Sequence, residues 1–415
     1  MLTLLVAASA CTSEREPPPA AKVADAPAPA VAPTPAPQAT PESPPPDAAS
    51  VRAALERLEQ QLRPAAGDPT NPWALAHGLL AFGPDFETRS GGAAVAAIMA
   101  SATPIGPAGA RRYRFPRQGD DGTPVDPHPY GLALAMRSAG VPLGAAHAAA
   151  DGEVITLGRL LTDLRQAPDP DSEPTGEDDD ARWHSVAWRL SALALDLEAA
   201  ETTDVRYDAL RARALARLER DVAPFIEARA APGAFAPRAP MGAAKRGKTH
   251  LYGHSCGGLH FLDAVVRSHP ATGDAGDTGD TEAAQRVAAT LATLHIRFEA
   301  EHSLYRSLLR RSPSTVLLLT VQQLKFYGHV LEVLGHAHAQ GYRAPGQPGA
   351  VQLAALEVRV TTALLEVLTR LDTLGAYQKL DAVRAKREQT YLDLIGDGCH
   401  AVAAMRLLLP RLDGD

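Results

Sequence analysis

The stretch VRAALERLEQQLR (residues 51–63) places Val51, Leu55, Leu58 and Leu62 at intervals of three or four residues. In an α-helix this spacing gathers the apolar side chains into one stripe, as expected of a helix that packs one face against a core. Further helices with this period are predicted at 71–82, 90–101, 129–138, 156–166, 181–200, 205–229, 249–268, 282–310, 314–340, 350–374 and 385–409. No run of alternating β-branched residues predicts a strand. The sequence therefore predicts an all-α domain without a sheet.

The N-terminus reads MLTLLVAASA (residues 1–10), a short apolar run that ends in small residues and is followed by Cys11. Small residues before a cleavage site are typical of a signal peptide. Ala8-Ser9-Ala10-Cys11 resembles a bacterial lipobox, which implies lipidation of Cys11 and a membrane anchor in the cell envelope. Thr12, after the cysteine, favours the outer membrane. An ordinary cleaved signal and a chance apolar start are the alternatives.

Residues 17–48 consist almost entirely of Pro, Ala and small polar residues. Such a segment cannot build a core, and its prolines favour an extended polyproline II spacer. The predicted organisation is a lipoprotein signal peptide (1–10), a lipidated Cys11 with a disordered tether (11–50), and an all-helical domain (51–415).

Bulk composition excludes several classes of protein. Hydrophobic residues make up 45 % and charged residues 21 % of the chain, which is normal for a protein that buries a core. The net charge of −7 gives no reason to expect a nucleic-acid partner. Cys11, Cys256 and Cys399 are the only cysteines, too few for a disulfide scaffold. The sequence contains no stretch of 18 apolar residues, so no transmembrane helix is predicted.

A short motif recurs at what look like helix starts. Tyr252-Gly253-His254 is followed 75 residues later by Tyr327-Gly328-His329. A repeat of this length fits two helices and their loops, and a glycine at such a position allows two backbones to approach closely. We expect an α/α toroid, in which helical hairpins form a ring around a central funnel; an open superhelix of helix pairs is the alternative.

Four segments carry a resemblance to a group of proteins: HGLLAFGPDF (77–86), DPHP (126–129), GHSCGGLHFLDAV (253–265) and YGHVLEVLGHA (327–337). They resemble uncharacterised exported bacterial lipoproteins of toroid-like character, some labelled "ADP-ribosylation factor-directed GTPase activating protein". That label does not suit an exported protein, because such an activator needs a small GTPase as its target. Known toroids, among them terpenoid cyclases, protein prenyltransferases and polysaccharide lyases, carry their chemistry in the funnel, but this is an analogy of fold alone.

Spacing along the predicted helices groups polar residues on shared faces. His329, Glu332 and His336 stand at i, i+3 and i+7 of one otherwise apolar helix. Cys256 and His260 stand at i and i+4 of another, and Asp397 and His400 at i and i+3 of the last. If the repeated motif marks inner helices, these faces point into one funnel. The candidate catalytic residues are His254, His260, His329, Glu332, His336, Asp397 and His400.

Imidazole, thiolate and carboxylate groups are the ligands that zinc and related divalent ions prefer. The candidate metal ligands are His329, His336, His260, Cys256 and Asp397. Asp397-Gly398-Cys399 also resembles the Asp-x-Cys zinc ligands of prenyltransferase toroids. Three alternatives stay open: a metal-free acid–base site, a Cys256–Cys399 disulfide, and histidines that serve only the core.

Two functions follow from these patterns. The first is an envelope lipoprotein whose funnel either only binds a glycan-like ligand or also cleaves it, with the help of a divalent metal such as zinc. One of Trp73, Trp183 and Trp188 could then stack on a sugar ring at the rim. The second is a catalytically inert helical scaffold for an envelope protein. The sequence leaves open whether the protein is an enzyme.

Overall fold

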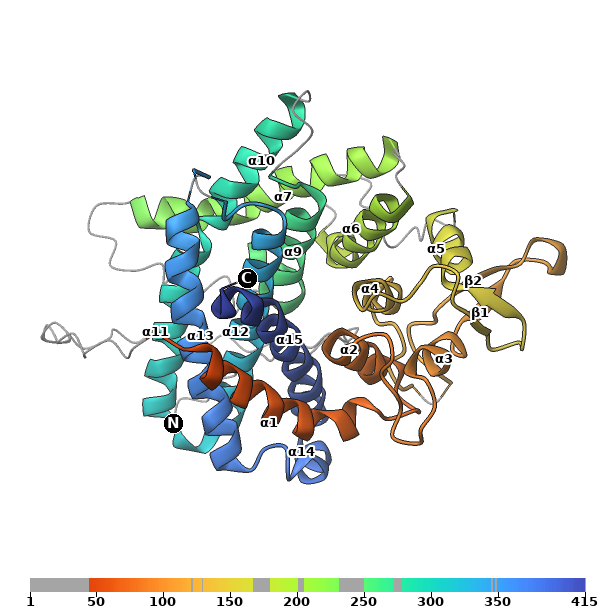
Figure 1. Cartoon of the computed structure of the whole chain (residues 1–415), viewed down its shortest axis with the longest axis horizontal. Coiled ribbons are helices and arrows are strands. Elements are labelled where there is room, and N and C mark those ends of the chain that lie inside the picture. Colours follow the sequence, from red (N-terminus) through yellow and green to blue (C-terminus); the bar gives the residue numbers. More distant parts are fainter. Residues whose placement is uncertain are drawn as a thin grey trace, which may run out of the picture.

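The computed structural model describes residues 45–120, 122–128, 130–166, 180–200, 205–230, 250–271, 278–344, 346–347 and 349–414. The predicted signal peptide, Cys11 and nearly all of the tether fall in 1–44, outside the described residues. Most of the described chain is helical, as predicted (Figure 1). Within it, no helix is both long enough and apolar enough to cross a membrane.

The N-terminal half of the described chain contains short helices, a 3₁₀ turn and two hairpins. Its elements are α1 (Ala48–Ala66), α2 (Pro72–Phe82), α3 (Ala94–Met99), β1 (Thr103–Ile105), η1 (Ala108–Ala110), β2 (Arg112–Arg114), α4 (Gly131–Ser138), β3 (Ala146–Ala148), β4 (Val154–Thr156), α5 (Leu157–Gln166) and α6 (Asp180–Ala200). The boundary between tether and domain differs from the prediction: Asp47 caps α1 by accepting a hydrogen bond from the backbone N–H of Ser50. The helix therefore begins three residues before Val51.

The C-terminal half contains the longer helices. Its elements are α7 (Val205–Ala230), η2 (His250–Gly253), η3 (Ser255–Gly258), α9 (Leu259–Ser268), α10 (Thr278–Leu291), α11 (Leu294–Arg311), η4 (Pro313–Thr315), α12 (Val316–Ala339), α13 (Ala350–Leu374), α14 (Leu380–Lys386) and α15 (Glu388–Asp413). Three predicted helices, 249–268, 282–310 and 385–409, do not match single elements. The first is divided among η2, η3 and α9, the second is divided between α10 and α11, and the third is preceded by the separate short helix α14.

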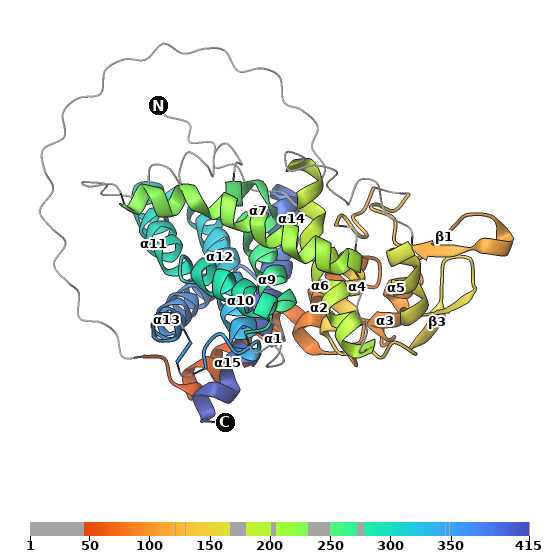
Figure 2. The same cartoon turned by 90° about the horizontal axis from the view of Figure 1, so that it is seen from above.

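The expectation that the chain has no sheet is wrong in detail. β1 pairs antiparallel with β2, and β3 pairs antiparallel with β4. Each strand has only three residues, too short for an alternating pattern to stand out in the sequence. Both hairpins project from the edge of the helical body in both views (Figures 1 and 2).

Six helices pack in a cyclic order in the middle of the molecule. α2 contacts α4, α4 contacts α6, α6 contacts α9, α9 contacts α12, α12 contacts α15, and α15 returns to α2. α1 and α13 lie outside this ring, where α1 packs on α15 and α13 on α12. A closed inner ring is what a toroid requires, although a complete outer layer of paired helices stays a prediction.

The two copies of the repeated motif do not occupy equivalent places. Tyr252 and Gly253 lie in the 3₁₀ turn η2, whereas Tyr327-Gly328-His329 lies in the middle of α12. The predicted role of glycine does not hold at Gly328, where a Cβ atom would lie 3.4 Å from the backbone nitrogen of Ala401 on α15, an ordinary contact. It does hold on the same helix at Gly335, where a Cβ atom would lie 2.9 Å from Cβ of Leu407, so the missing side chain lets α12 and α15 approach closely.

Candidate functional site

The ring of six helices surrounds a cavity of about 90 Å³. Every helix of the ring contributes to its wall. The titratable residues that line it are His77, His128, His260, His329, His400, Cys256, Asp126, Asp263, Glu332, Asp393, Asp397, Arg267 and Lys325. Burial raises the pKa of Asp126 well above its usual value, so four charged carboxylates and two permanent cations remain, a balance suited to a metal cation.

Three imidazole rings meet on one side of this cavity. The centroids of His260 and His329 are 4.4 Å apart, those of His329 and His400 are 4.2 Å apart, and those of His260 and His400 are 5.1 Å apart. The three rings come from α9, α12 and α15 respectively. His329 and His400 are both buried. Three histidines from three helices thus form one compact cluster.

Glu332 joins two of these rings. Its Oε2 lies 2.9 Å from Nδ1 of His400 and 3.4 Å from Nδ1 of His329. Glu332 and His329 stand three residues apart on α12, so the helix itself places the carboxylate beside the ring. On the other side of His329, Nε2 lies 3.5 Å from Oδ1 of Asp397 and makes no well-formed hydrogen bond to any residue that the structure describes.

Burial and neighbouring charges set the protonation states of the cluster. Burial, together with the nearby His329 and His400, holds the pKa of His260 well below its usual value, so its ring is neutral. Burial alone would also lower the pKa of His329, but the carboxylates of Asp397 and Glu332 outweigh it and raise this pKa to about 9. Burial would raise the pKa of Glu332, yet His400 and His329 hold it well below its usual value. The cluster therefore combines a neutral imidazole, an imidazolium and a carboxylate.

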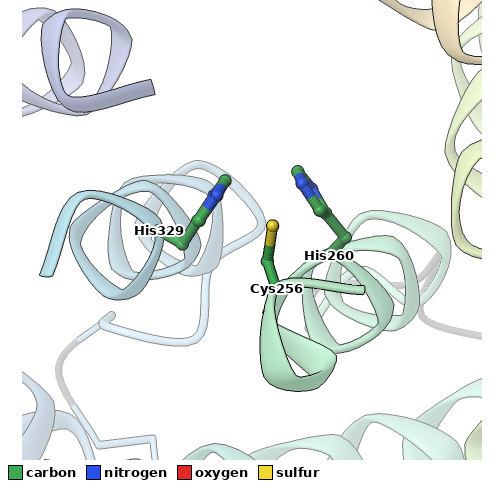
Figure 3. A group of neighbouring side chains, drawn as sticks. All are labelled: Cys256, His260 and His329. Atoms are coloured by element: carbon green, nitrogen blue, oxygen red, sulfur yellow. The ribbon is translucent and has the colours of Figure 1, made fainter. Parts of the chain in front are cut away.

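Cys256 is a further donor to this cluster. Single ligand atoms of Cys256, His260 and His329 lie within 4.8 Å of one another, and the same holds for His329, Glu332 and His400. Figure 3 shows the thiol of Cys256 and the two rings pointing into the same space. Cys256 has a left-handed backbone, with φ of 50° and ψ of 34°, and the next two residues are glycines with positive φ. A left-handed cysteine is strained, and here this turn directs the thiol toward the cluster.

A buried lysine neutralises part of the acidic wall. Nζ of Lys325 lies 3.0 Å from Oδ1 of Asp393 and 3.7 Å from Oδ2 of Asp397. Since Lys325 lies four residues before His329 on α12, it belongs to the same face of that helix. It therefore holds Asp397 in place beside His329.

Sequence reasoning placed two residues in the cluster that lie elsewhere. Nε2 of His254 donates a hydrogen bond to the carboxylate of Asp221 at 2.7 Å, and its ring stacks on Phe261, so His254 belongs to the interface with α7. His336 lies 2.6 Å from Asp263 and contacts Arg267 rather than the three rings. His336 stands seven residues after His329, about 10 Å along the helix, which takes it past the cluster.

The other predicted site residues are brought together, namely Cys256, His260, His329, Glu332, Asp397 and His400. Sequence reasoning missed Lys325, Asp393, Asp263 and His77, all of which line the cavity. For Lys325 a signal existed, because a lysine four residues before His329 extends the polar stripe of an otherwise apolar helix. The pairing of His77 with His400, whose ring centroids are 5.3 Å apart, depends on how α2 and α15 pack and has no local signal.

The possible disulfide does not form, since Cys256 and Cys399 are both free. Cys399 is fully buried and does not line the cavity. Burial, reinforced by Asp397, raises the pKa of its thiol, which makes it a poor metal ligand. The likeness of Asp397-Gly398-Cys399 to a zinc-binding tripeptide therefore does not extend to a shared site.

Comparison with known proteins gave no matching family model, no matching curated protein and no matching solved structure. What the cavity does must therefore be inferred from its own chemistry.

Proposed function

We propose that the cavity binds one divalent ion of the zinc class through His260, His329, His400 and Glu332, and that the protein is a metal-dependent hydrolase. The observation that carries this proposal is the convergence of three imidazole rings, 4.2 to 5.1 Å apart, from three different helices, with one carboxylate bonded to two of the rings. Three histidines are a common ligand set of catalytic zinc sites. Cys256 is an additional donor on the same side.

The electrostatics of the cluster support a cation. Without one, the buried group retains a proton on His329, because two carboxylates beside it need positive charge nearby. A divalent ion would supply that charge, and His329 would release its proton to offer the ion a nitrogen lone pair. The neutral state of His260 also suits a ligand, since only the unprotonated ring offers a lone pair.

The room left beside the cluster favours a catalytic site over a structural one. Structural zinc sites are closed by four protein ligands, whereas catalytic sites keep a position for water. A cavity of about 90 Å³ has room for about three water molecules. When bound, the ion would make its water a nucleophile near neutral pH. Asp397, held by Lys325, would keep the ring of His329 in the orientation that the ion needs.

The proposal retains a glycan-like substrate in the cell envelope. Trp73 and Trp188 lie in the cavity wall, which supports the approach of a ring-shaped group, although both are also packed against histidines. Anchoring through a lipid on Cys11, and an outer-membrane location, are proposed from the sequence of the N-terminus alone. The toroid is supported by the cyclic packing of the six helices.

Metal content tests the proposal. The full chain is purified without chelator and without a nickel column, and its metals are measured by mass spectrometry. We expect close to one zinc or related ion per chain, retained in His338→Ala and lost in His329→Ala. His338 is a suitable control because it is an exposed histidine on the same helix. A metal-free wild-type protein that also takes up no added zinc would contradict the proposal and favour the inert scaffold.

A further inference from the structure

Two helices of the ring carry matched polar residues along their facing sides. On α9 these are His260, Asp263 and Arg267, and on α12 they are His329, Glu332 and His336. Both series have the spacing i, i+3 and i+7. His260 faces His329 at one end, and Arg267 faces His336 at the other, with 2.7 Å between the guanidinium and the ring. The cavity therefore has a metal-ligand end and an arginine end.

The guanidinium of Arg267 is held in a fixed position. Its Nε donates to Oδ2 of Asp263 at 2.9 Å, and Nη2 contacts Nε2 of His336 at 2.7 Å. Asp263 in turn binds Nδ1 of His336 at 2.6 Å. Burial would raise the pKa of Asp263, but His336 and Arg267 hold it below its usual value, so the carboxylate stays charged. These contacts hold Nε and Nη2 of the guanidinium in place and do not involve its third nitrogen, Nη1.

That third nitrogen, Nη1, is nearly unused. Among the described residues its one polar contact is the hydroxyl of Ser138 on α4, at a long 3.4 Å. Arg267 and Ser138 both line the cavity. A rigid, partly buried guanidinium whose Nη1 makes only one long hydrogen bond, beside a hydroxyl that can also donate, is a donor set that binds carboxylates and related oxyanions.

The distance between the two ends bears on the size of the ligand. Seven residues separate Arg267 from His260 on α9, which is about 10 Å along the helix axis. The side chains cover part of this rise, since the guanidinium of Arg267 contacts Asp263, one turn nearer to His260. An acid with several bonds between its reacting group and its carboxylate fits the span that is left.

We propose that Arg267, with the hydroxyl of Ser138, binds a carboxylate or similar oxyanion of the substrate while the substrate's hydrolysable group lies at the metal. This inference rests on the proposed function and adds the class of substrate: an acid whose anionic group is several bonds away from the bond that is cleaved. Asp263 and His336 are positioning residues that orient the guanidinium. His336, first placed among the metal ligands, thus serves the other end of the cavity.

Linear dicarboxylates of increasing length test whether one ligand can contact both the metal and Arg267. The full chain is loaded with cobalt(II), whose visible spectrum reports ligands at the metal, and is titrated with acetate, succinate, glutarate and adipate. We expect at least one dicarboxylate to bind about tenfold more tightly than acetate, because its second carboxylate gains a charge-assisted contact with Arg267. In Arg267→Lys this preference should disappear while the affinity for acetate is unchanged.

Two controls separate the possible failures. Arg286→Met removes an arginine that pairs with Glu219 outside the cavity, and it should keep the preference for dicarboxylates. Arg267→Lys retains the positive charge and so guards against simple misfolding, which the cobalt spectrum and a thermal melt would reveal. If cobalt binds but the preference is absent, or persists in Arg267→Lys, the anion site is wrong and the metal site stands. If cobalt does not bind, both proposals fail.

Discussion

At the scale of single residues, the pKa of Asp393 shows most clearly how burial affects the charged groups that line the cavity. Its carboxylate lies 3.0 Å from the ammonium group of Lys325, yet burial outweighs this contact and raises its pKa from 3.8 to about 6. Folding therefore favours the protonated form of Asp393. The stability that this group contributes is present in full below pH of about 4, and it is lost as the pH rises through about 6.

Asp393→Asn should remove this pH dependence, because an amide does not titrate. Relative to the wild type, the variant should gain up to about 3 kcal/mol in free energy of unfolding between pH 4 and pH 7, since each pKa unit corresponds to about 1.4 kcal/mol. Urea unfolding in the presence of a chelator measures this difference. The exposed residue Asp85 supplies the control variant, Asp85→Asn. An equal effect of Asp393→Asn at both pH values would show that the carboxyl is not buried as described.

At the scale of elements, the site depends on how closely α12 approaches α15. Two glycines on α12, seven residues apart, face α15. A Cβ at Gly328 would lie 3.4 to 3.5 Å from Ala401, which is ordinary contact, whereas a Cβ at Gly335 would lie 2.9 Å from the Cβ of Leu407. This close packing keeps His329 within reach of His400.

The two glycines should therefore respond differently to alanine. Both substitutions gain helix propensity, but only Gly335→Ala forces the helices apart. We expect Gly335→Ala to be less stable than Gly328→Ala by roughly 1–3 kcal/mol, as measured by urea unfolding. Equal stability of the two variants would mean that the helices are packed less tightly than the structure has them.

The helices themselves could be predicted from the sequence because each buries one stripe, and the stripe is visible as a period. Their interruptions could not. The break between α10 and α11 at residues 292–293 carries no glycine or proline, so only packing defines it. Cys256 and His260 were expected to share a helix face; they do lie together, but through a left-handed turn at Gly257 and Gly258 that precedes α9. The prediction of proximity held although its geometric reason was different.

At the scale of the whole molecule, the site exists only because six helices close into a ring. Spacing along one helix could predict that His329 and Glu332 are neighbours. It could not predict that His260 and His400, which are 140 residues apart, meet at a centroid distance of 5.1 Å. Nor could it show that His254 pairs with Asp221 and His336 with Asp263. These carboxylates lie beside the histidines only once the helices have packed together.

Anomalous diffraction at the zinc edge, from crystals of the zinc-loaded chain, tests the proposed metal site without a substrate. We expect a single peak between α9, α12 and α15, about 2.0–2.2 Å from one nitrogen each of His260, His329 and His400 and from an oxygen of Glu332. A peak elsewhere, for example beside Asp263 and His336, or no peak at saturating zinc, would contradict it.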